Sequence, residues 1–364
     1  MRPRLHALTT LRFFAALHVV LFHMRVVGIL PGGPWWYQNF ASIGFVGVNF
    51  FFVLSGFILV YTYDGLHLSA AKFWWARFAR IYPAYVLSLI VAAPFFFFAV
   101  HNLDLPFFAW SKEHFALACV LTLTLLQSWV PQAALTWNSV CWSLSVEAFF
   151  YLVFPLALLR SKKLSEKGLL VCLIGFWLAS FSFACSYIHF HPDGIDKINS
   201  GETNLFWKNV LSFNPLVRLP EFLVGMFTGK LFLARSSEKQ PGTTLIIAGL
   251  LGFAVVILLA PHIPNPILSV GILSPAFAAI IYGAAQQPKW TSFLAFPVLV
   301  LLGEASYSLY LLHSVVITRI FDSLSYWNRS LRIAGCLVAV IFISIIAYRL
   351  VEAPARRYLR PPKA

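Results

Sequence analysis

Long uninterrupted apolar runs constrain the fold of this chain more than any other feature. Most have roughly 20 residues, the length at which an α-helix crosses the ~30 Å hydrocarbon core of a bilayer. A transmembrane β-barrel would show shorter segments of alternating polarity, and these runs do not alternate. The candidate spans are 8–28, 43–63, 81–100, 114–130, 139–159, 168–188, 210–233, 243–260, 267–285, 293–318 and 331–351.

The composition agrees with a membrane protein. Hydrophobic residues make up 60% of the 364 residues and charged residues 11%, whereas a soluble domain carries about 25% charged residues. We therefore predict an all-α, polytopic transmembrane helical bundle that occupies 1–364 as a single integral-membrane domain, with no appended soluble domain. The net charge of +14 collects in short loops, which indicates contact with membrane lipid and no nucleic-acid partner.

Positive charges predict the topology, because lysine and arginine are enriched in cytoplasmic loops. They gather at Arg2, Arg4, Lys72, Arg77, Arg80, Arg160, Lys162, Lys163, Lys167, Arg235, Lys239, Lys289, Arg356, Arg357, Arg360 and Lys363. An even number of crossings must separate Arg80 from Arg160, yet three apolar runs lie between them. The run 114–130 is short and polar near its end, so we expect it to be re-entrant, half-length or broken. About ten full spans remain, with both termini cytoplasmic.

The first apolar run carries two ionisable side chains, Arg12 and His23. The step of eleven residues from Arg12 to His23 turns through about 1100°, within about 20° of three full turns, so both share one helix face ~16 Å apart. In a bilayer, His23 then lies about halfway across. An ionisable group at that depth is costly and marks a functional site by default. The alternative is a packed core histidine bonded to a backbone carbonyl.

Two further arginines, Arg77 and Arg80, are three positions apart in FWWARFARIYP. Residues with this spacing share a helix face, so both guanidiniums can point one way at the cytoplasmic surface. Two such groups form a good receptor for phosphate. The alternative is an ordinary positively charged cytoplasmic loop.

Glu147 is the only carboxylate between Glu113 and Glu166, and it lies within a predicted span. A buried carboxylate without a partner is strongly penalised, so we expect a cationic or hydrogen-bonding group beside it. Asn138 and Ser143 are nearby polar residues. A structural ion pair with an arginine on another helix and a catalytic role are both open.

Two more carboxylates, Glu221 and Glu352, lie near the ends of predicted spans. Each has an arginine within four positions, Arg218 and Arg356 respectively, and such neighbours face each other on a helix. We expect structural ion pairs at both places.

Glu304 and His313 are nine residues apart, about 900° around a helix, so they do not share a face. Trp35 and Trp36 lie in a predicted outer loop, 28–40. Tryptophans are typical of the membrane interface, and their ring faces can also stack on sugars.

Seven motifs occur in order over residues 8–359. They read LTTLRFFAALHVVLFH, GVNFFFVLSGFIL, FWWARFARIYPAY, WSLSVEAFFYLVFP, RLPEFLVGMFTGKL, LGEASYSLYLLH and YRLVEAPARRYL. Together they resemble membrane-bound acyltransferase family 3, bacterial integral-membrane O-acyltransferases that act on surface glycans and related acceptors. The resemblance implies transfer of an acyl group, usually acetyl, from acyl-CoA to a hydroxyl, most often on a surface glycan or its lipid-linked precursor. It also implies a multi-pass location in the bacterial cytoplasmic (inner) membrane.

The family's motifs include most of the residues singled out above. They coincide with Arg12 and His23, Arg77 and Arg80, Trp142, Ser143, Leu144 and Glu147, and Tyr310 and His313. The first motif departs from the common lead LDGLRG and adds His18, which lies about 140° around the helix from His23.

Resemblance and spacing together suggest a mechanism. Arg77, Arg80 and Arg12 bind the phosphates of acyl-CoA, whose pantetheine arm runs ~16 Å along the first helix to His23. His23 acts as general base on the acceptor hydroxyl, and Glu147 orients it or stabilises its imidazolium, as in a catalytic triad. Acyl-CoA is a co-substrate, and we predict neither a permanently bound cofactor nor a metal site. The expected substrate-binding residues are Asn138, Trp142, Ser143, Tyr310, His313, Trp35 and Trp36.

Several alternatives stay open at this point. A transporter of a small anion or a lipid-linked sugar also fits many spans with few buried charges, but it predicts paired broken helices in its two halves. An acyltransferase could instead act on a lipid or a small secreted metabolite. A transient acyl-histidine could replace general-base catalysis. The sequence does not indicate an oligomeric state.

Overall fold

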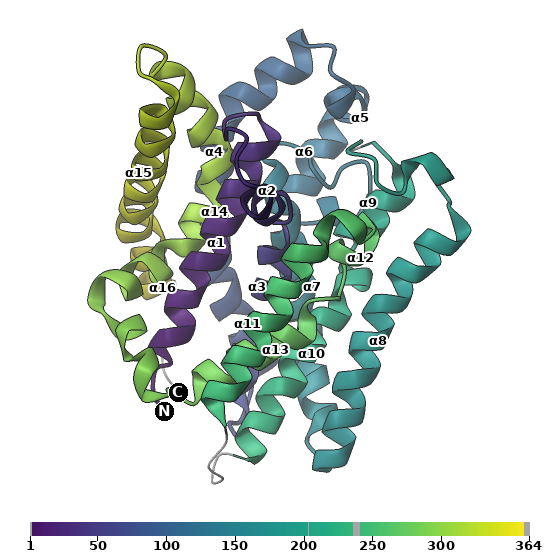
Figure 1. Cartoon of the computed structure of the whole chain (residues 1–364), viewed down its shortest axis with the longest axis vertical. Coiled ribbons are helices and arrows are strands. Elements are labelled where there is room, and N and C mark those ends of the chain that lie inside the picture. Colours follow the sequence, from purple (N-terminus) through teal and green to yellow (C-terminus); the bar gives the residue numbers. More distant parts are fainter. Residues whose placement is uncertain (1, 203, 236–240, 360–364) are drawn as a thin grey trace.

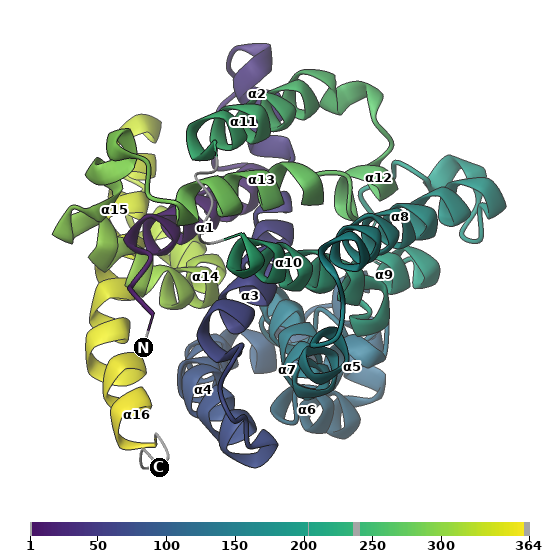
Figure 2. The same ribbon diagram turned by 90° about the horizontal axis from the view of Figure 1, so that it is seen from below.

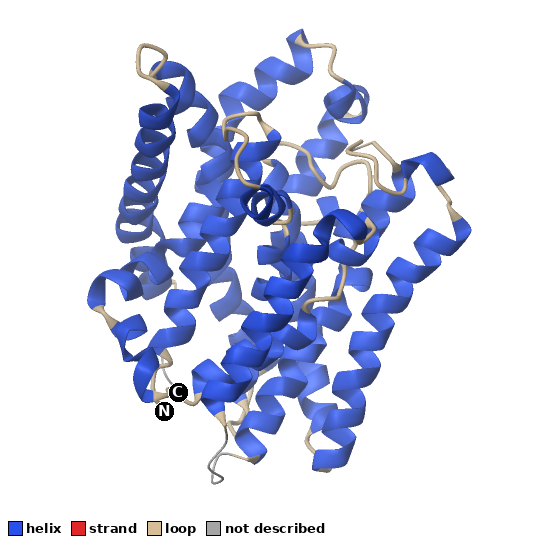
Figure 3. Ribbon diagram, viewed as in Figure 1, coloured by secondary structure: helices blue, strands red, loops and turns tan. Residues whose placement is uncertain are grey.

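The computed structural model describes residues 2–202, 204–235 and 241–359, and its regular structure within these ranges is entirely helical (Figure 3). Lys239, Arg360 and Lys363, expected in cytoplasmic segments, lie outside the described residues. The α-helices are α1 (His6–Val26), α2 (Trp35–Ser42), α3 (Val46–Tyr63), α4 (Ala70–Asn102), α5 (Ala109–Glu113), α6 (Phe115–Leu123), α7 (Trp142–Ser161), α8 (Glu166–Phe190), α9 (Phe206–Phe213), α10 (Pro215–Ala234), α11 (Gly242–Leu259), α12 (Asn265–Ser269), α13 (Ser274–Ala285), α14 (Pro297–Ser323), α15 (Arg329–Ala347) and α16 (Ala353–Tyr358). Short 3₁₀ segments lie at Pro106–Phe108, Gln127–Trp129, Ser139–Cys141, Ile195–Lys197, Ala260–His262 and Lys289–Ala295, and a π-helical turn at Tyr348–Glu352.

Within the described ranges, nine helical segments are long and apolar enough to cross a membrane. They are His6–Val26, Val46–Tyr63, Ala70–Asn102, Ser139–Ser161, Glu166–Phe190, Gly242–His262, Asn265–Ala285, Pro297–Ser323 and Arg329–Tyr358. The 20-residue helix α10 is a tenth candidate by length, although it carries Arg218, Glu221 and Lys230. These helices confirm the polytopic helical bundle predicted from the sequence.

The helix α4 corrects the predicted start of the span 81–100 and agrees with the helical interpretation of the paired arginines. It begins at Ala70, where the side chain of Ser69 accepts a hydrogen bond from the backbone N–H of Lys72, which is typical of a helix N-cap. Arg77 and Arg80 therefore lie within a 33-residue helix, as their helical spacing assumes, and not in the alternative of an ordinary loop before 81–100. Apolarity alone misplaces this start, because the first turns of α4 are rich in charged and interfacial residues.

The expected short segment at 114–130 is confirmed. Its helix α6 has nine residues, about 14 Å at 1.5 Å per residue, which is too short to cross a bilayer. A turn and the 3₁₀ segment follow it before α7 begins. The structure thus supplies the broken element that the charge distribution requires between Arg80 and Arg160.

Two other predicted spans are interrupted, which the sequence analysis does not anticipate. The run 210–233 breaks at Asn214, whose side chain caps α10 directly before Pro215 at the first helical position, a combination that favours a new helix start. The run 267–285 breaks between α12 and α13, where Gly271 has a φ of +81°, a conformation that favours glycine.

Close helix crossings place α1 and α3 inside the bundle. A Cβ on Gly225 of α10 would lie 1.8 Å from the Val53 carbonyl oxygen of α3, and a Cβ on Gly303 of α14 would lie 2.1 Å from that of Thr9 on α1. Only glycine permits such approaches between membrane helices. The helix α10 lies near the middle of the bundle (Figure 2), with α8 and α15 on opposite flanks and both described chain ends at one end of the molecule (Figure 1).

Candidate active site

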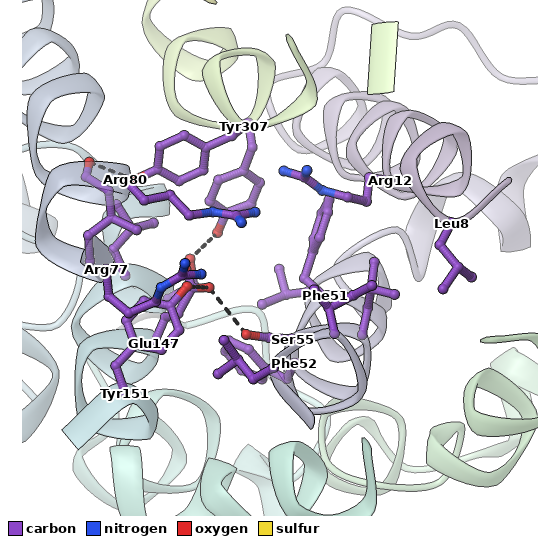
Figure 4. A pocket seen from close by; sticks show the side chains of 18 of the residues that line it. Leu8, Arg12, Phe51, Phe52, Ser55, Arg77, Arg80, Glu147, Tyr151 and Tyr307 are labelled. Atoms are coloured by element: carbon purple, nitrogen blue, oxygen red, sulfur yellow. Dashed lines mark hydrogen bonds between the residues drawn. The ribbon is translucent and has the colours of Figure 1, made fainter. Parts of the chain in front are cut away.

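A pocket of about 240 Å³ opens among α1, α3, α4, α7 and α14 (Figure 4). The structure brings together six of the side chains singled out in the sequence, because its wall includes Arg12, Arg77, Arg80, Ser143, Glu147 and Tyr310. The rest of the wall is mainly apolar and aromatic, with Phe51 and Phe52 from α3, Tyr151 from α7 and Tyr307 from α14. The charged groups come from helices far apart in the chain, so only the folded bundle assembles this site.

Three guanidinium groups line this pocket. Arg12 and Arg80 extend toward each other from α1 and α4 (Figure 4), and neither makes a hydrogen bond or an ion pair with another described residue. Arg77 donates to the hydroxyl of Tyr63 at 3.1 Å and lies 5.8 Å from the ring centre of Tyr151. Its Nε is buried without a partner in the described structure. Spare donors on three arginines facing one space suit a polyanionic ligand.

Glu147 is the only carboxylate among the residues that line this pocket. It accepts a hydrogen bond from Tyr151, four residues later in α7, and one at 3.4 Å from Ser55 of α3. The prediction that Glu147 contacts His23 is therefore wrong. The carboxylate accepts its hydrogen bonds from the hydroxyls of Tyr151 and Ser55. The structural ion pair considered for Glu147 is not formed among the described residues either.

His23 instead pairs with a second histidine. Its Nδ1 lies 3.1 Å from Nε2 of His313 on α14 and 3.0 Å from the carbonyl oxygen of Val19. His313 is fully buried, whereas His23 is only partly buried. The packed-histidine alternative predicts the carbonyl contact but not the second ring. Neither histidine belongs to the wall of the arginine pocket.

The predicted structural ion pairs are confirmed. Arg218 lies 2.9 Å from Glu221 in α10, and both side chains are buried. Arg356 pairs with Glu352, which also accepts a hydrogen bond from Ser308 at 2.8 Å. As the helical spacing predicts, Glu304 and His313 face different partners, since Glu304 accepts from Tyr348 of the π-helical turn.

The predicted substrate-binding residues of α7 and α14 have different surroundings. The hydroxyls of Ser143 and Tyr310 lie 2.7 Å apart at the pocket wall. The indole of Trp142 packs edge-on against Phe52 and lies 5.8 Å from the guanidinium of Arg218. Trp142 therefore supports the pocket from behind and does not line it.

The remaining predicted substrate-binding residues lie away from the pocket. The amide of buried Asn138 donates to the carbonyl of Leu311 at 2.9 Å and accepts from Ser314 at 3.2 Å, so it joins the loop before α7 to α14. Trp35 and Trp36 begin the short helix α2 and are 60% and 55% exposed. The structure does not bring these tryptophans to the arginines.

Ser55, Tyr151 and Phe51 line the pocket but are not among the site residues predicted from the sequence. Tyr151 could have been found, because it follows Glu147 by four positions and so shares its helix face. Ser55 and Phe51 lie within the motif GVNFFFVLSGFIL, but no spacing rule connects them to Glu147, which is more than ninety positions later in the sequence.

Comparison with known proteins agrees with the resemblance noted in the motifs. A family model described as "Acyltransferase domain" matches residues 5–349. The chain is similar to the acyltransferase MdmB of Streptomyces mycarofaciens, with 29% identity over 98% of this chain and 92% of that protein. It is also similar to the O-acetyltransferase OatA of Staphylococcus aureus, with 24% identity over 98% of this chain.

The coverage of these relatives differs. The chain spans 58% of the length of OatA and 56% of a putative O-acetyltransferase from Staphylococcus aureus strain COL, to which it is 27% identical. No solved structure gives a significant match.

Proposed function

The chain belongs to acyltransferase family 3 and is a multi-pass membrane acyltransferase, and from this premise we propose a specific reaction. It transfers an acyl group, usually acetyl, from acyl-CoA to a hydroxyl of a surface polysaccharide or exopolysaccharide sugar or its lipid-linked precursor, in the bacterial inner membrane. The observation that carries the proposal is the convergence of Arg12, Arg77 and Arg80 on one pocket.

The arginine pocket is the proposed site for the phosphates of CoA. Acyl-CoA is polyanionic, and Arg12 and Arg80 have no internal anionic partner at hydrogen-bond distance among the described residues. Charge-assisted hydrogen bonds to phosphate are short and strong. The aromatic wall around Phe51 and Tyr307 gives the rest of the ligand an apolar surface.

His23 is the proposed general base for acyl transfer. It lies on the same face of α1 as Arg12 and ~16 Å further along the axis, so the pantetheine arm is directed along α1 toward it. Nε2 of His23 takes the proton of the acceptor hydroxyl while the oxygen attacks the thioester carbonyl carbon. The C–S bond then breaks, and the thiolate leaves with that proton as free CoA. General-base catalysis typically contributes ~10²–10⁴-fold.

The names of the relatives support a hydroxyl acceptor, because two of the similar proteins are described as O-acetyltransferases or putative O-acetyltransferases. The exposed Trp35 and Trp36 are the proposed stacking surface for the sugar on the side away from the arginines. An acyltransferase acting on a lipid or a small secreted metabolite is the second candidate. It stays open because MdmB, the relative matched over 92% of its length, is described as an acyltransferase without a named acceptor.

A labelling experiment tests the proposed reaction and separates the two acceptor classes. Membranes containing the protein are incubated with radiolabelled acetyl-CoA and separated into glycan, lipid and soluble fractions. We expect label in the glycan fraction with the parent protein and none with His23→Ala at equal amounts of inserted protein. The control is His18→Ala, at a buried histidine of α1 whose ring contacts the carbonyl of Phe40, and it should retain labelling.

Each other outcome contradicts a stated part of the proposal. Glycan labelling by His23→Ala would exclude His23 as the base. Label confined to lipid or to a small metabolite would replace the glycan acceptor, and absence of label from every fraction would contradict acetyl-CoA as the donor.

A further inference from the structure

We infer that His313 is a positioning residue for His23: it accepts a hydrogen bond from Nδ1 of His23 and thereby leaves Nε2 as the nitrogen that takes the proton. This inference rests on the proposed function of His23 as general base. It assigns a role to a side chain that lies outside the arginine pocket.

The protonation of His313 follows from its neighbours. Its Nδ1 lies 2.7 Å from the carbonyl oxygen of Tyr310 and 3.3 Å from that of Leu309. Carbonyl oxygens only accept hydrogen bonds, so Nδ1 of His313 carries a hydrogen. In a neutral imidazole one nitrogen donates and the other accepts, which leaves Nε2 of His313 as an acceptor.

The protonation of His23 then follows in turn. Its Nδ1 lies 3.1 Å from that acceptor nitrogen of His313 and 3.0 Å from the carbonyl oxygen of Val19. Both neighbours accept, so Nδ1 of His23 carries the hydrogen and its Nε2 holds a lone pair. The bond made by one ring nitrogen thus sets the role of the other.

Burial decides which ring can meet a substrate. His313 is 0% exposed, while His23 is partly exposed. Among the described residues, the two histidine rings pack against each other and against the rings of Phe22 and Tyr310. No charged side chain among the described residues makes a hydrogen bond or ion pair with either ring, so the second histidine takes the place that a carboxylate occupies in a Ser-His-Asp triad.

The position of His313 is itself fixed by the fold. Asn138 donates to the carbonyl of Leu311, two positions before His313 in α14, and accepts from the hydroxyl of Ser314, one position after it. The helix continues for ten residues past His313, ~15 Å, so the pair lies inside the bundle. A fixed acceptor at this depth holds the ring of His23 in one orientation.

The chemical consequence appears when the acceptor hydroxyl is deprotonated. Its proton moves to Nε2 of His23, which becomes an imidazolium with both nitrogens protonated. The Nδ1–H then makes a charge-assisted hydrogen bond to Nε2 of His313, stronger than the neutral bond. The proton on Nε2 passes to the leaving thiolate of CoA, and the pair returns to its starting state.

A matched pair of substitutions tests this inference. Glutamine and methionine have similar lengths, but only the amide of glutamine supplies a strong acceptor. We expect His313→Met to lower kcat by at least ~10²-fold, since loss of the correct tautomer in a triad costs up to ~10⁴-fold. His313→Gln should keep kcat within about tenfold of the parent. In both variants KM for acetyl-CoA should stay within about twofold of the parent, because position 313 does not line the arginine pocket.

The outcomes separate this inference from the proposed function. Parent-like kcat in His313→Met, or equal losses in His313→Met and His313→Gln at equal insertion, would overturn the positioning role even if His23→Ala is inactive. An active His23→Ala would instead overturn the proposed function. His18→Met, at a buried histidine of α1 that does not contact the pair, is the control for effects of the substitution on folding.

Discussion

Replacing Arg80 by methionine separates phosphate binding from structural support. Methionine keeps most of the apolar stem of arginine and removes its charge. Arg80 makes no hydrogen bond or ion pair with another described residue, so its loss leaves no protein group without a partner. A hydrogen bond to a charged group is worth about 1.5–3 kcal/mol, which corresponds to an increase of about 10- to 100-fold in Kd for CoA.

The assay measures binding of CoA and of pantetheine, which lacks phosphate, to the purified protein in detergent. We expect Arg80→Met to weaken CoA binding and to leave pantetheine binding unchanged. The matched control is Arg332→Met, because the guanidinium of Arg332 lies 3.6 Å above the ring of Phe321 and outside the pocket wall. An unchanged Kd for CoA, or equal losses for CoA and pantetheine, would refute the assignment of the phosphates to Arg80.

Two further predictions concern the pocket and the helix crossing behind it. Glu147→Gln should tighten CoA binding by several-fold, since it removes the only carboxylate among the pocket-lining residues and so reduces repulsion of an anion; unchanged or weaker binding would argue against a nearby phosphate. Gly225→Ala should destabilise the protein by about 1–3 kcal/mol and lower its Tm, because the new Cβ would lie 1.8 Å from the carbonyl oxygen of Val53. Gly175→Ala, where nothing lies within 4 Å, is its control, and equal Tm values would contradict the close crossing.

The sequence predicts well those features that depend on one helix. Apolar length predicts the bundle, and neighbours at helical spacing predict the Arg218–Glu221 and Arg356–Glu352 ion pairs. The charge balance between Arg80 and Arg160 predicts that one apolar run between them is not a full span, and α6 is indeed short.

Features that depend on contact between distant helices could not be predicted in the same way. Glu147 is expected to have a partner, but its second one is Ser55 of α3, which resembles many other serines in apolar helices. The pairing of His23 with His313 joins residues 290 positions apart. Helical spacing says which side chains share a face, but the packing of α1 against α14 decides which faces meet.

The most direct test of the account is a structure of the protein with a non-reactive acetyl-CoA analogue, in which the thioester sulfur is replaced by a methylene group. We predict that the phosphates contact Arg12, Arg77 and Arg80, and that the pantetheine arm extends along α1 with the acetyl group directed to Nε2 of His23. Phosphates bound elsewhere, or an acetyl group that points away from His23, would contradict the proposed reaction.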